Sequence, residues 1–281
     1  MSYHDITFVI CSCDKYEDAW HPFFELLHIY GVDPTYPMVL NTETKQYTSP
    51  HFNIRVVNTT EKVTWSKRMR NVLEQIDTEF VFLLLEDYFL KAPFDNARFE
   101  SVLDYMRTHP DVAFLDIAPW YSNSVEEVEA HQRNHVNTPD SFRERNNKNY
   151  NICVVPSIYR RDAFLDLLRD HEDVWQYERY VGIRAAKHGY KVVRYNTHTP
   201  TIYEYDFQQT GSGLGITRGQ WLPGNAAFFA QHGIEANLDR LGVLDVATIE
   251  EIKNLRRSPK EFLRVTIRKL KTILNLPKSL R

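Results

Sequence analysis

The stretch FVFLLLEDYFL, residues 80–90, decides the fold class of this chain. Its first six residues, Phe80 to Leu85, form a continuous apolar run of the kind found in a strand that is buried on both faces of a parallel sheet. Two adjacent acids, Glu86 and Asp87, follow at once. The stretch therefore predicts a central strand that ends at a charged loop.

Shorter apolar runs alternate with helical patterns on both sides of this strand. Strands are predicted at residues 6–11, 38–40, 54–56, 112–116 and 152–155, and helices at residues 20–30, 65–76, 99–106, 161–169 and 178–188. This alternation predicts an α/β fold with a mostly parallel central sheet, flanked by helices and joined by right-handed crossovers. Ligands of such sheets bind at the carboxyl ends of the strands.

Polar residues follow several of the predicted strands, among them Ser12, Asn41, Glu86 and Asp87. Buried carboxylates cost several kcal/mol unless a cation or hydrogen bonds compensate them. Glu86 and Asp87 are therefore candidates to hold a divalent metal, Mn2+ or Mg2+, against a diphosphate. The alternative is a strand-end pair that is capped by the next loop or by Arg68.

The net charge of -3 is the sum of two unequal parts. From Lys253 to the end there are ten Lys and Arg and one acid, which leaves 24 basic and 36 acidic residues before them. The acidic body disfavours nucleic-acid binding, because a surface that follows phosphates needs basic residues along one face. The basic end fits an acidic partner or an anionic membrane surface.

The three cysteines, Cys11, Cys13 and Cys153, cannot all pair, and two of them lie at a predicted strand end. A disulfide framework is therefore not expected, and the sequence predicts a cytoplasmic location. The first residues lack the basic region and apolar stretch of a secretory signal. No apolar run approaches the roughly 20 residues that cross a bilayer.

Three blocks of sequence resemble those of a known enzyme family. They are ITFVICSCDKYEDAW (6–20), WSKRMRNVLEQIDTEFVFLLLEDYFL (65–90) and WQYERYVGIRAAKHGYKV (175–192). In this order they resemble a nucleotide-sugar-dependent GT-A glycosyltransferase, family-two-like and of the bacterial polysaccharide or lipopolysaccharide type. The resemblance spans about residues 6–200. It implies a GT-A, Rossmann-like domain, assigned to residues 1–245, with a C-terminal helical extension at residues 246–281.

The resemblance also implies roles for residues of the second block. In this family the first strand ends at the nucleotide base, a helix with an Arg-Asn pair precedes the central strand, and that strand ends in a metal-binding D-x-D motif. Arg70 and Asn71 match the pair, and Asp87 becomes the main metal ligand. Tyr88 stands in place of the third acid, so metal dependence is weaker or basic residues neutralise the diphosphate.

The third block implies the catalytic base. Family members carry a Glu-Asp pair, an Arg six residues after the Asp, and a Gly-Tyr five and six residues further on. Arg184, Gly189 and Tyr190 fit this spacing, which puts Glu178 at the Asp and Tyr177 at the Glu. By this resemblance Glu178 deprotonates the acceptor hydroxyl in an inverting reaction. The alternative is a first-turn acid that favours the helix macrodipole.

Positions near the strand ends add candidates for binding the donor. Asp14 and Tyr16 follow the first strand and either contact the base and ribose or form a solvated turn. Trp65 begins a helix and either seats the nucleotide or packs in the core. The full candidate set for the nucleotide diphosphate sugar is Ser12, Asp14, Tyr16, Trp65, Arg68, Arg70, Glu86, Asp87 and Arg218.

Three further features lie outside the matched motifs or beside them. Residues 210–224 hold five of the ten glycines, so they are a candidate lid that would bring Arg218 to the phosphates. His198 is either a third metal ligand or a histidine of a surface loop. Trp175 and Tyr177 form either a wall on which sugars stack or part of the core.

The segment KEFLRVTIRKLKTILNLPKSLR, residues 260–281, has the pattern of a basic amphipathic helix. Its leucines and isoleucines recur on one face, and its basic residues share an adjacent face. This pattern favours peripheral binding to the inner face of the cell membrane through anionic lipids. The alternative is a helix that docks on the acidic body or on a second subunit of a homo-oligomer.

These features together predict a membrane-peripheral glycosyltransferase of the hexosyltransferase type. It is expected to move a sugar from a nucleotide diphosphate sugar, here a UDP-sugar, to a hydroxyl of a glycan or lipid-linked acceptor. One alternative is a nucleotidyltransferase, which is disfavoured because residues 12–16 contain no glycine for a phosphate loop. The other is a non-catalytic, membrane-associated sugar-binding module.

Overall fold

The computed structural model describes residues 5–118, 142–144, 152–195, 201–205, 215–245 and 248. The chain divides into two compact units, Met1–Tyr205 and Asp206–Arg281, and each is described by itself. The family resemblance falls within the first unit. The predicted domain boundary after residue 245 lies inside the second unit and stays a prediction, and the basic tail lies outside the described residues.

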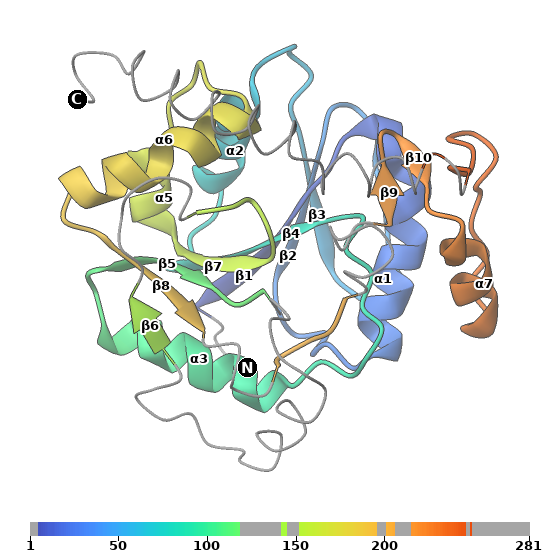
Figure 1. The fold of residues 1–281 in the computed structure, drawn as a ribbon, viewed down its shortest axis with the longest axis horizontal. Coiled ribbons are helices and arrows are strands. Elements are labelled where there is room, and N and C mark those ends of the chain that lie inside the picture. The colour runs from blue at the N-terminus through green and yellow to red at the C-terminus, as the bar shows by residue number, and fades with distance from the viewer. Residues whose placement is uncertain are drawn as a thin grey trace. The chain divides into compact units, whose positions relative to one another are not determined.

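A mixed sheet of eight strands forms the centre of the first unit, in the order β3-β2-β1-β4-β7-β5-β8-β6 (Figure 1). Neighbouring strands pair in parallel except where β7 and β6 run against their neighbours. The predicted α/β class with a mostly parallel sheet is confirmed. The strands are β1 (Ile6–Cys11), β2 (Met38–Thr42), β3 (Ile54–Asn58), β4 (Phe80–Leu85), β5 (Val112–Asp116), β6 (Phe142–Glu144), β7 (Ser157–Arg160) and β8 (Lys191–Tyr195).

Helices follow most of the strands, and some of them begin at a side-chain cap. Thr64 caps the second helix by accepting a hydrogen bond from the Lys67 N–H at 3.3 Å, and Asp95 caps the third. The described helices of this unit are α1 (Trp20–Ile29), α2 (Trp65–Leu73), α3 (Asn96–Thr108), α5 (Arg161–Leu167) and α6 (Val174–Lys187), with a short 3-10 helix, η1 (Asp14–Ala19).

Alternate residues of the central strands face two separate helix layers. Val9 and Val81 belong to a buried cluster with residues of α2, α5 and α6. Phe8 and Phe82 point the other way and meet Phe99 of α3, with ring centroids 5.4 and 5.0 Å away. Both faces of β1 and β4 are thus covered, which explains why these strands are apolar at every position except Thr7.

The strand predicted at residues 152–155 is wrong. The strand of this region is β7, which lies antiparallel between β4 and β5. Pro156 has no N–H to donate to a neighbouring strand, and Val155 closes a turn by donating to the Cys153 carbonyl at 2.9 Å. The apolar segment before β7 is therefore a loop, and it lies at the edge of the sheet where β4 ends.

The described part of the second unit contains a short hairpin and one helix. The hairpin joins β9 (Ile216–Thr217) to β10 (Gln220–Trp221), and α7 (Gly224–Gln231) follows. Arg218 and Gly219 form its tip with φ of 54° and 79°, as a tight two-residue hairpin turn requires. The described residues of the predicted lid, 215–224, thus form regular structure. Among the described residues, no helix combines the length and apolarity that crossing a membrane needs.

Candidate active site

The carboxyl ends of β1 and β4 mark the place where the chain changes direction across the sheet. From β1 the chain moves outward through β2 to β3, and then it returns to β4 on the other side of β1. Connections that leave in opposite directions open a crevice, and this is where ligands of α/β sheets bind. Because Cys11 pairs with Leu85, Ser12 and Glu86 follow at the same level.

Arg68 on α2 reaches over the ends of β1 and β2. Its guanidinium donates to the Glu43 carboxylate at 2.8 Å, to the Ser12 carbonyl at 2.5 Å and to Oδ1 of Asn41 at 3.2 Å. Arg68 therefore caps the ends of β1 and β2, whereas its capping of Glu86 and Asp87, the alternative interpretation of the sequence, stays a prediction. Glu43, its ion-pair partner, was missed, although an acid within three residues of the predicted strand 38–40 is a signal that could have found it.

Glu86 is a buried carboxyl group at the end of β4. Burial raises its pKa well above the usual value, and the charge of Asp87 raises it further, whereas the Ser12 hydroxyl and Arg68 lower it. The Ser12 hydroxyl also accepts a hydrogen bond from Nε1 of Trp20 at 2.7 Å. Two adjacent acids in this state fit a hard cation, whose charge would relieve their repulsion.

The charges of two predicted acids, Asp87 and Glu178, act on the hydroxyl of Tyr88. Tyr88 is buried, and its ring packs edge-on against Tyr205 with centroids 5.3 Å apart. Burial raises the pKa of Tyr88, and the charges of Asp87 and Glu178 raise it further. Glu178 on α6 and Asp87 after β4 thus both lie within electrostatic reach of the same tyrosine.

Glu178 lies in the second turn of α6. The helix begins at Val174, four residues earlier than predicted, because Asp173 and Gln176 form a reciprocal capping box. The interpretation of Glu178 as a first-turn acid is therefore wrong. Its Oε1 accepts a hydrogen bond from the Val154 N–H at 2.6 Å. Burial raises the pKa of Glu178, although this hydrogen bond lowers it in part.

Arg184, the arginine of the third block, is buried in the interior of the protein. Its two Nη atoms donate to the two carboxylate oxygens of Glu172, both at 2.7 Å, and the side chains are 2% and 4% exposed. Glu172 directly precedes the capping box of α6. The pair therefore anchors the loop that starts the helix, which gives the spacing between Arg184 and Glu178 a structural reason.

Tyr16 of η1 also belongs to this site. Burial raises the pKa of Tyr16, and the charges of Cys13, Glu86 and Asp87 raise it further, so its hydroxyl lies within electrostatic reach of the acidic pair. The ammonium group of Lys15 lies 5.3 Å from the centre of the Tyr16 ring. The residues after β1 thus bring an aromatic side chain and a cation to the crevice.

Asp14 holds the loop that follows β2. Its Oδ1 accepts hydrogen bonds from the backbone N–H groups of Glu43, Thr44 and Lys45 at 3.0, 3.1 and 3.3 Å. Burial acts to raise the pKa of Asp14, but the hydrogen bonds from these three residues outweigh it and bring the pKa to about 2. The carboxylate thus has a structural role, and its contact with a nucleotide stays a prediction.

Asp14→Ala is expected to lower the free energy of unfolding by about 1 to 2 kcal/mol at neutral pH, because three backbone donors lose a charged acceptor. The folded pKa of Asp14, about 2, lies below the unfolded value of about 3.9. The stabilisation is therefore present above about pH 4 and is lost as the pH falls through 2. Urea unfolding at pH 7, 4 and 2.5 should show that the difference in free energy of unfolding between Asp14→Ala and wild type becomes smaller as the pH falls. Glu61→Ala, which removes an exposed carboxylate, is the control for the loss of one surface charge.

Two other predicted contacts lie elsewhere. Trp65 packs against Tyr177 with ring centroids 5.1 Å apart, and its Nε1 donates to Sγ of Cys11 at 3.3 Å, so it belongs to the core beside β1. Arg70 donates to Asp170 at 2.6 Å. Side chains two positions apart on a helix do not share a face, so Arg68 and Arg70 cannot both reach the strand ends.

The remaining candidates separate in three ways. Arg218 stands at the hairpin tip of the second unit, and its contact with phosphates stays a prediction. His198 lies outside the described residues. Of the predicted aromatic wall, Tyr177 is fully buried and belongs to the core, whereas Trp175 is 69% exposed.

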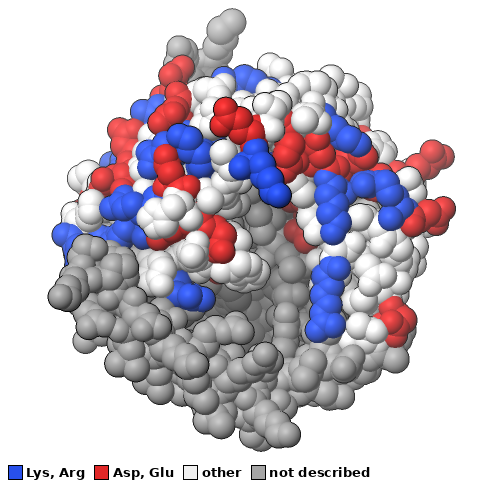
Figure 2. Space-filling view, turned by 90° about the horizontal axis from the view of Figure 1, so that it is seen from above, with Lys and Arg blue, Asp and Glu red and all other residues white. Residues whose placement is uncertain are grey.

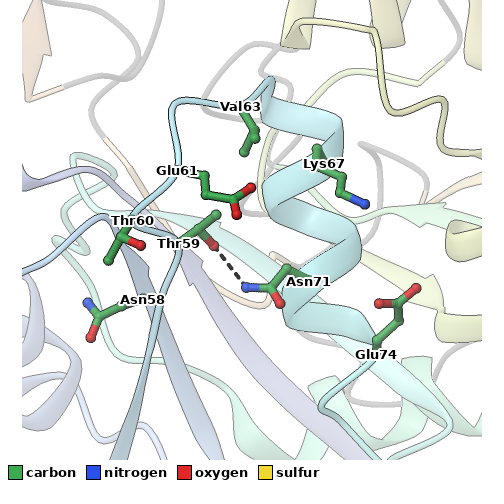
Figure 3. A pocket seen from close by; sticks show the side chains of 8 residues that line it. All are labelled: Asn58, Thr59, Thr60, Glu61, Val63, Lys67, Asn71 and Glu74. Atoms are coloured by element: carbon green, nitrogen blue, oxygen red, sulfur yellow. Dashed lines mark hydrogen bonds between the residues drawn. The ribbon is translucent and has the colours of Figure 1, made fainter.

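A pocket of about 260 Å3 opens at the carboxyl end of the edge strand β3 (Figure 3). Asn71 on α2 donates to the Thr59 hydroxyl at 2.9 Å across it. Because Asn58 pairs with Thr42, the pocket lies on the same edge of the sheet as the crevice, about 10 Å from β1 by two strand spacings. Its lining residues are Asn58, Thr59, Thr60, Glu61, Val63, Lys67, Asn71 and Glu74.

The charged side chains of the described residues are mixed on the face shown in Figure 2. Lysines and arginines lie beside aspartates and glutamates there, without a continuous basic field. Such a field is what a nucleic-acid backbone binds.

No protein-family model matches the chain, and no curated protein gives a significant match. Solved structures of similar fold include the mannosyltransferase PcManGT from Pyrobaculum calidifontis in complex with GDP-Man and Mn2+, at 13% identity and a TM-score of 0.47, covering 71% of this chain and 56% of that chain. S. aureus TarS 1-349 in complex with UDP-GlcNAc is 11% identical with a TM-score of 0.49. The alignment covers 98% of this chain and 76% of that chain.

A third similar structure is the CMP:2-keto-3-deoxy-manno-octonic acid synthetase complexed with CTP. It is 14% identical with a TM-score of 0.36, and the alignment covers 67% of this chain and 88% of that chain. Structural similarity at this level of sequence identity concerns the fold alone, and it does not distinguish among functions.

Proposed function

We propose that this protein is a glycosyltransferase that moves a sugar from a nucleotide diphosphate sugar to a hydroxyl of a glycan or lipid-linked acceptor. The observation that carries the proposal is that the charges of Asp87 and Glu178 both act on Tyr88, which follows the carboxyl end of β4 at the point where the strand order reverses. Glycosyl transfer needs compensation for a leaving diphosphate and removal of an acceptor proton. A strand-end acid that can hold a cation and a half-buried acid with a raised pKa match these two needs.

In the proposed reaction the bond between the anomeric carbon and the diphosphate oxygen breaks, and its electron pair leaves with the nucleoside diphosphate. The acceptor oxygen forms the new bond to the anomeric carbon, and its proton passes to Glu178. The raised pKa of Glu178 makes its carboxylate a stronger proton acceptor than an exposed glutamate. The Val154 N–H holds the carboxylate in place during this transfer.

A divalent cation, Mn2+ or Mg2+, would be held by Asp87 with Glu86 beside it, and when bound it would neutralise charge on the diphosphate. Both acids are the hard oxygen ligands that such ions take. Among the described residues, no group of three or more His, Cys, Asp and Glu forms a metal site. Oxygens of the donor and of water would therefore complete the ligand set, with His198 as a further candidate.

We place the nucleotide along the ends of β1 and β2, where Ser12, Tyr16 and Arg68 lie. Arg68 is a fixed positive charge at this edge, and Tyr16 presents an aromatic ring near the acidic pair. Peripheral binding to an anionic membrane through residues 259–281 is part of the proposal and rests on the sequence pattern alone.

Asp87→Asn is expected to weaken metal-dependent donor binding at least about tenfold, because the amide loses the charge that a hard cation needs. The measurement is a thermal-shift panel of nucleotide sugars with and without Mn2+, since a bound donor raises Tm by mass action. Glu74→Gln, which alters an exposed acid just after the end of α2, is the matched control and should behave as wild type.

The same panel, with assays of product, separates the alternatives. A glycosyltransferase releases a nucleoside diphosphate from one donor, and a nucleotidyltransferase releases pyrophosphate from a nucleoside triphosphate and a sugar phosphate. A sugar-binding module releases neither with any metal. A donor that stabilises Asp87→Asn as strongly as wild type in Mn2+ would remove Asp87 from the metal site.

A further inference from the structure

Trp175 has an unusual place among the apolar side chains of the described residues. It is 69% exposed, compared with 43% for Ile29 and 46% for Val243. A single exposed apolar side chain is common on protein surfaces and marks no site by itself. The exposure of Trp175 is of interest because Trp175 lies close to Glu178 on the same helix.

Trp175 and Glu178 are three residues apart on α6, so they share one helix face with β-carbons about 5–6 Å apart. The capping box at the start of α6 holds the first turn in regular helix, so this spacing applies to Trp175. Glu178 is half-buried and interacts with Tyr88, whereas Trp175 reaches into solvent. The two side chains therefore form a line from the interior of the site to its rim.

The carboxylate of Glu178 uses one of its two oxygens in a hydrogen bond. Its Oε1 accepts from the Val154 N–H, and within the described ranges Oε2 has no hydrogen-bond partner. A base needs an oxygen within hydrogen-bond reach of the proton that it removes. An acceptor that approaches over Trp175 would bring a hydroxyl to Oε2.

We infer that Trp175 is the platform on which a pyranose ring of the acceptor stacks while its hydroxyl meets Glu178. This inference rests on the proposed function. A pyranose has an apolar face of C–H groups and a polar edge of hydroxyls, and an indole offers a large, rigid apolar face at low entropic cost. Stacking fixes the sugar ring, so its hydroxyl edge points along the helix face toward the carboxylate. Trp175 is thus a positioning residue for the acceptor.

Binding is tested first, with an array of immobilised pyranose oligosaccharides and the full chain without donor. Trp175→Ala is expected to lose about tenfold in affinity for the glycans that wild type binds, and Trp175→Phe is expected to restore most of it. Ile29→Ala, which trims an exposed apolar side chain at the end of α1, is the control. Equal binding by Trp175→Ala and wild type overturns the inference, as does the absence of any glycan bound by wild type.

Kinetics give the second test, with the oligosaccharide selected on the array as acceptor. Trp175→Ala should raise KM for the acceptor about tenfold with little change in kcat, because stacking acts before the reaction step. Its rate of donor hydrolysis without acceptor should equal that of wild type. If donor is hydrolysed and transferred with an unchanged KM, the stacking role fails alone. If no donor is bound or hydrolysed by wild type, the proposed function fails with it.

Discussion

Glu178→Gln is expected to reduce sugar transfer by about 100- to 10,000-fold, the range that a positioned general base contributes. The glutamine keeps the size of the side chain, and its amide oxygen can still accept the hydrogen bond that the Val154 N–H donates. Donor binding should therefore change little. The change should appear in kcat, measured at saturating donor and acceptor, while the donor-induced rise in Tm stays that of wild type.

The pH dependence of transfer gives an independent check on the same residue. Only the ionised carboxylate accepts a proton, so the wild-type rate should rise with pH as Glu178 loses its proton. Burial raises the pKa of this group, so the rise should fall at higher pH than for an exposed glutamate. The residual rate of Glu178→Gln should lack this rise. Turnover by Glu178→Gln near the wild-type level would remove Glu178 as the base.

Arg184→Met is expected to lower the free energy of unfolding by about 3–5 kcal/mol, because it leaves the Glu172 carboxylate buried without its partner. Glu172→Leu should have a similar effect, since it strands the guanidinium. The double variant should recover most of the loss, because an apolar pair of similar volume avoids the burial of charge. Urea unfolding of the two single variants and the double variant forms a complete cycle.

An ion pair on the surface provides the control for this cycle. Arg70→Met breaks the bond to Asp170, whose side chain is 47% exposed, and should cost at most about 1 kcal/mol. Single variants at positions 172 and 184 that unfold like Arg70→Met would show that the buried pair is not a major source of stability. A double variant no more stable than the single ones would show that the packing, rather than the charge, is what counts.

The sequence predicted the fold best where strands are covered on both faces. The runs Ile6–Cys11, Phe80–Leu85 and Val112–Asp116 are strands with the predicted bounds. The strand predicted from the apolar run at residues 152–155 was wrong, because an apolar loop that packs against the core has the same composition as a strand. Strand β7, with the sequence SIYR, is half polar and is held by neighbours on both sides, which a local pattern does not show.

Part of the site could also be predicted from the sequence. The acids after β4 and the acid on α6 were named from the sequence, and in the structure the charges of Asp87 and Glu178 both act on Tyr88. The choice between Arg68 and Arg70 required the rotation of α2 about its axis, which no residue type encodes. The hydrogen bond from the Val154 N–H to Glu178 could not be predicted either, because backbone N–H groups are alike along the sequence.

The antiparallel place of β7 also determines when a growing chain can complete its sheet. β7 closes the free side of β4 by pairing residues that are 80 positions apart, such as Phe80 and Arg160. Such long-range pairing is slow. Until the ribosome has released this strand, the most apolar segment of the chain presents an open edge to which strands of other chains can add. The stretch that decides the fold is therefore also the one in most need of protection during synthesis.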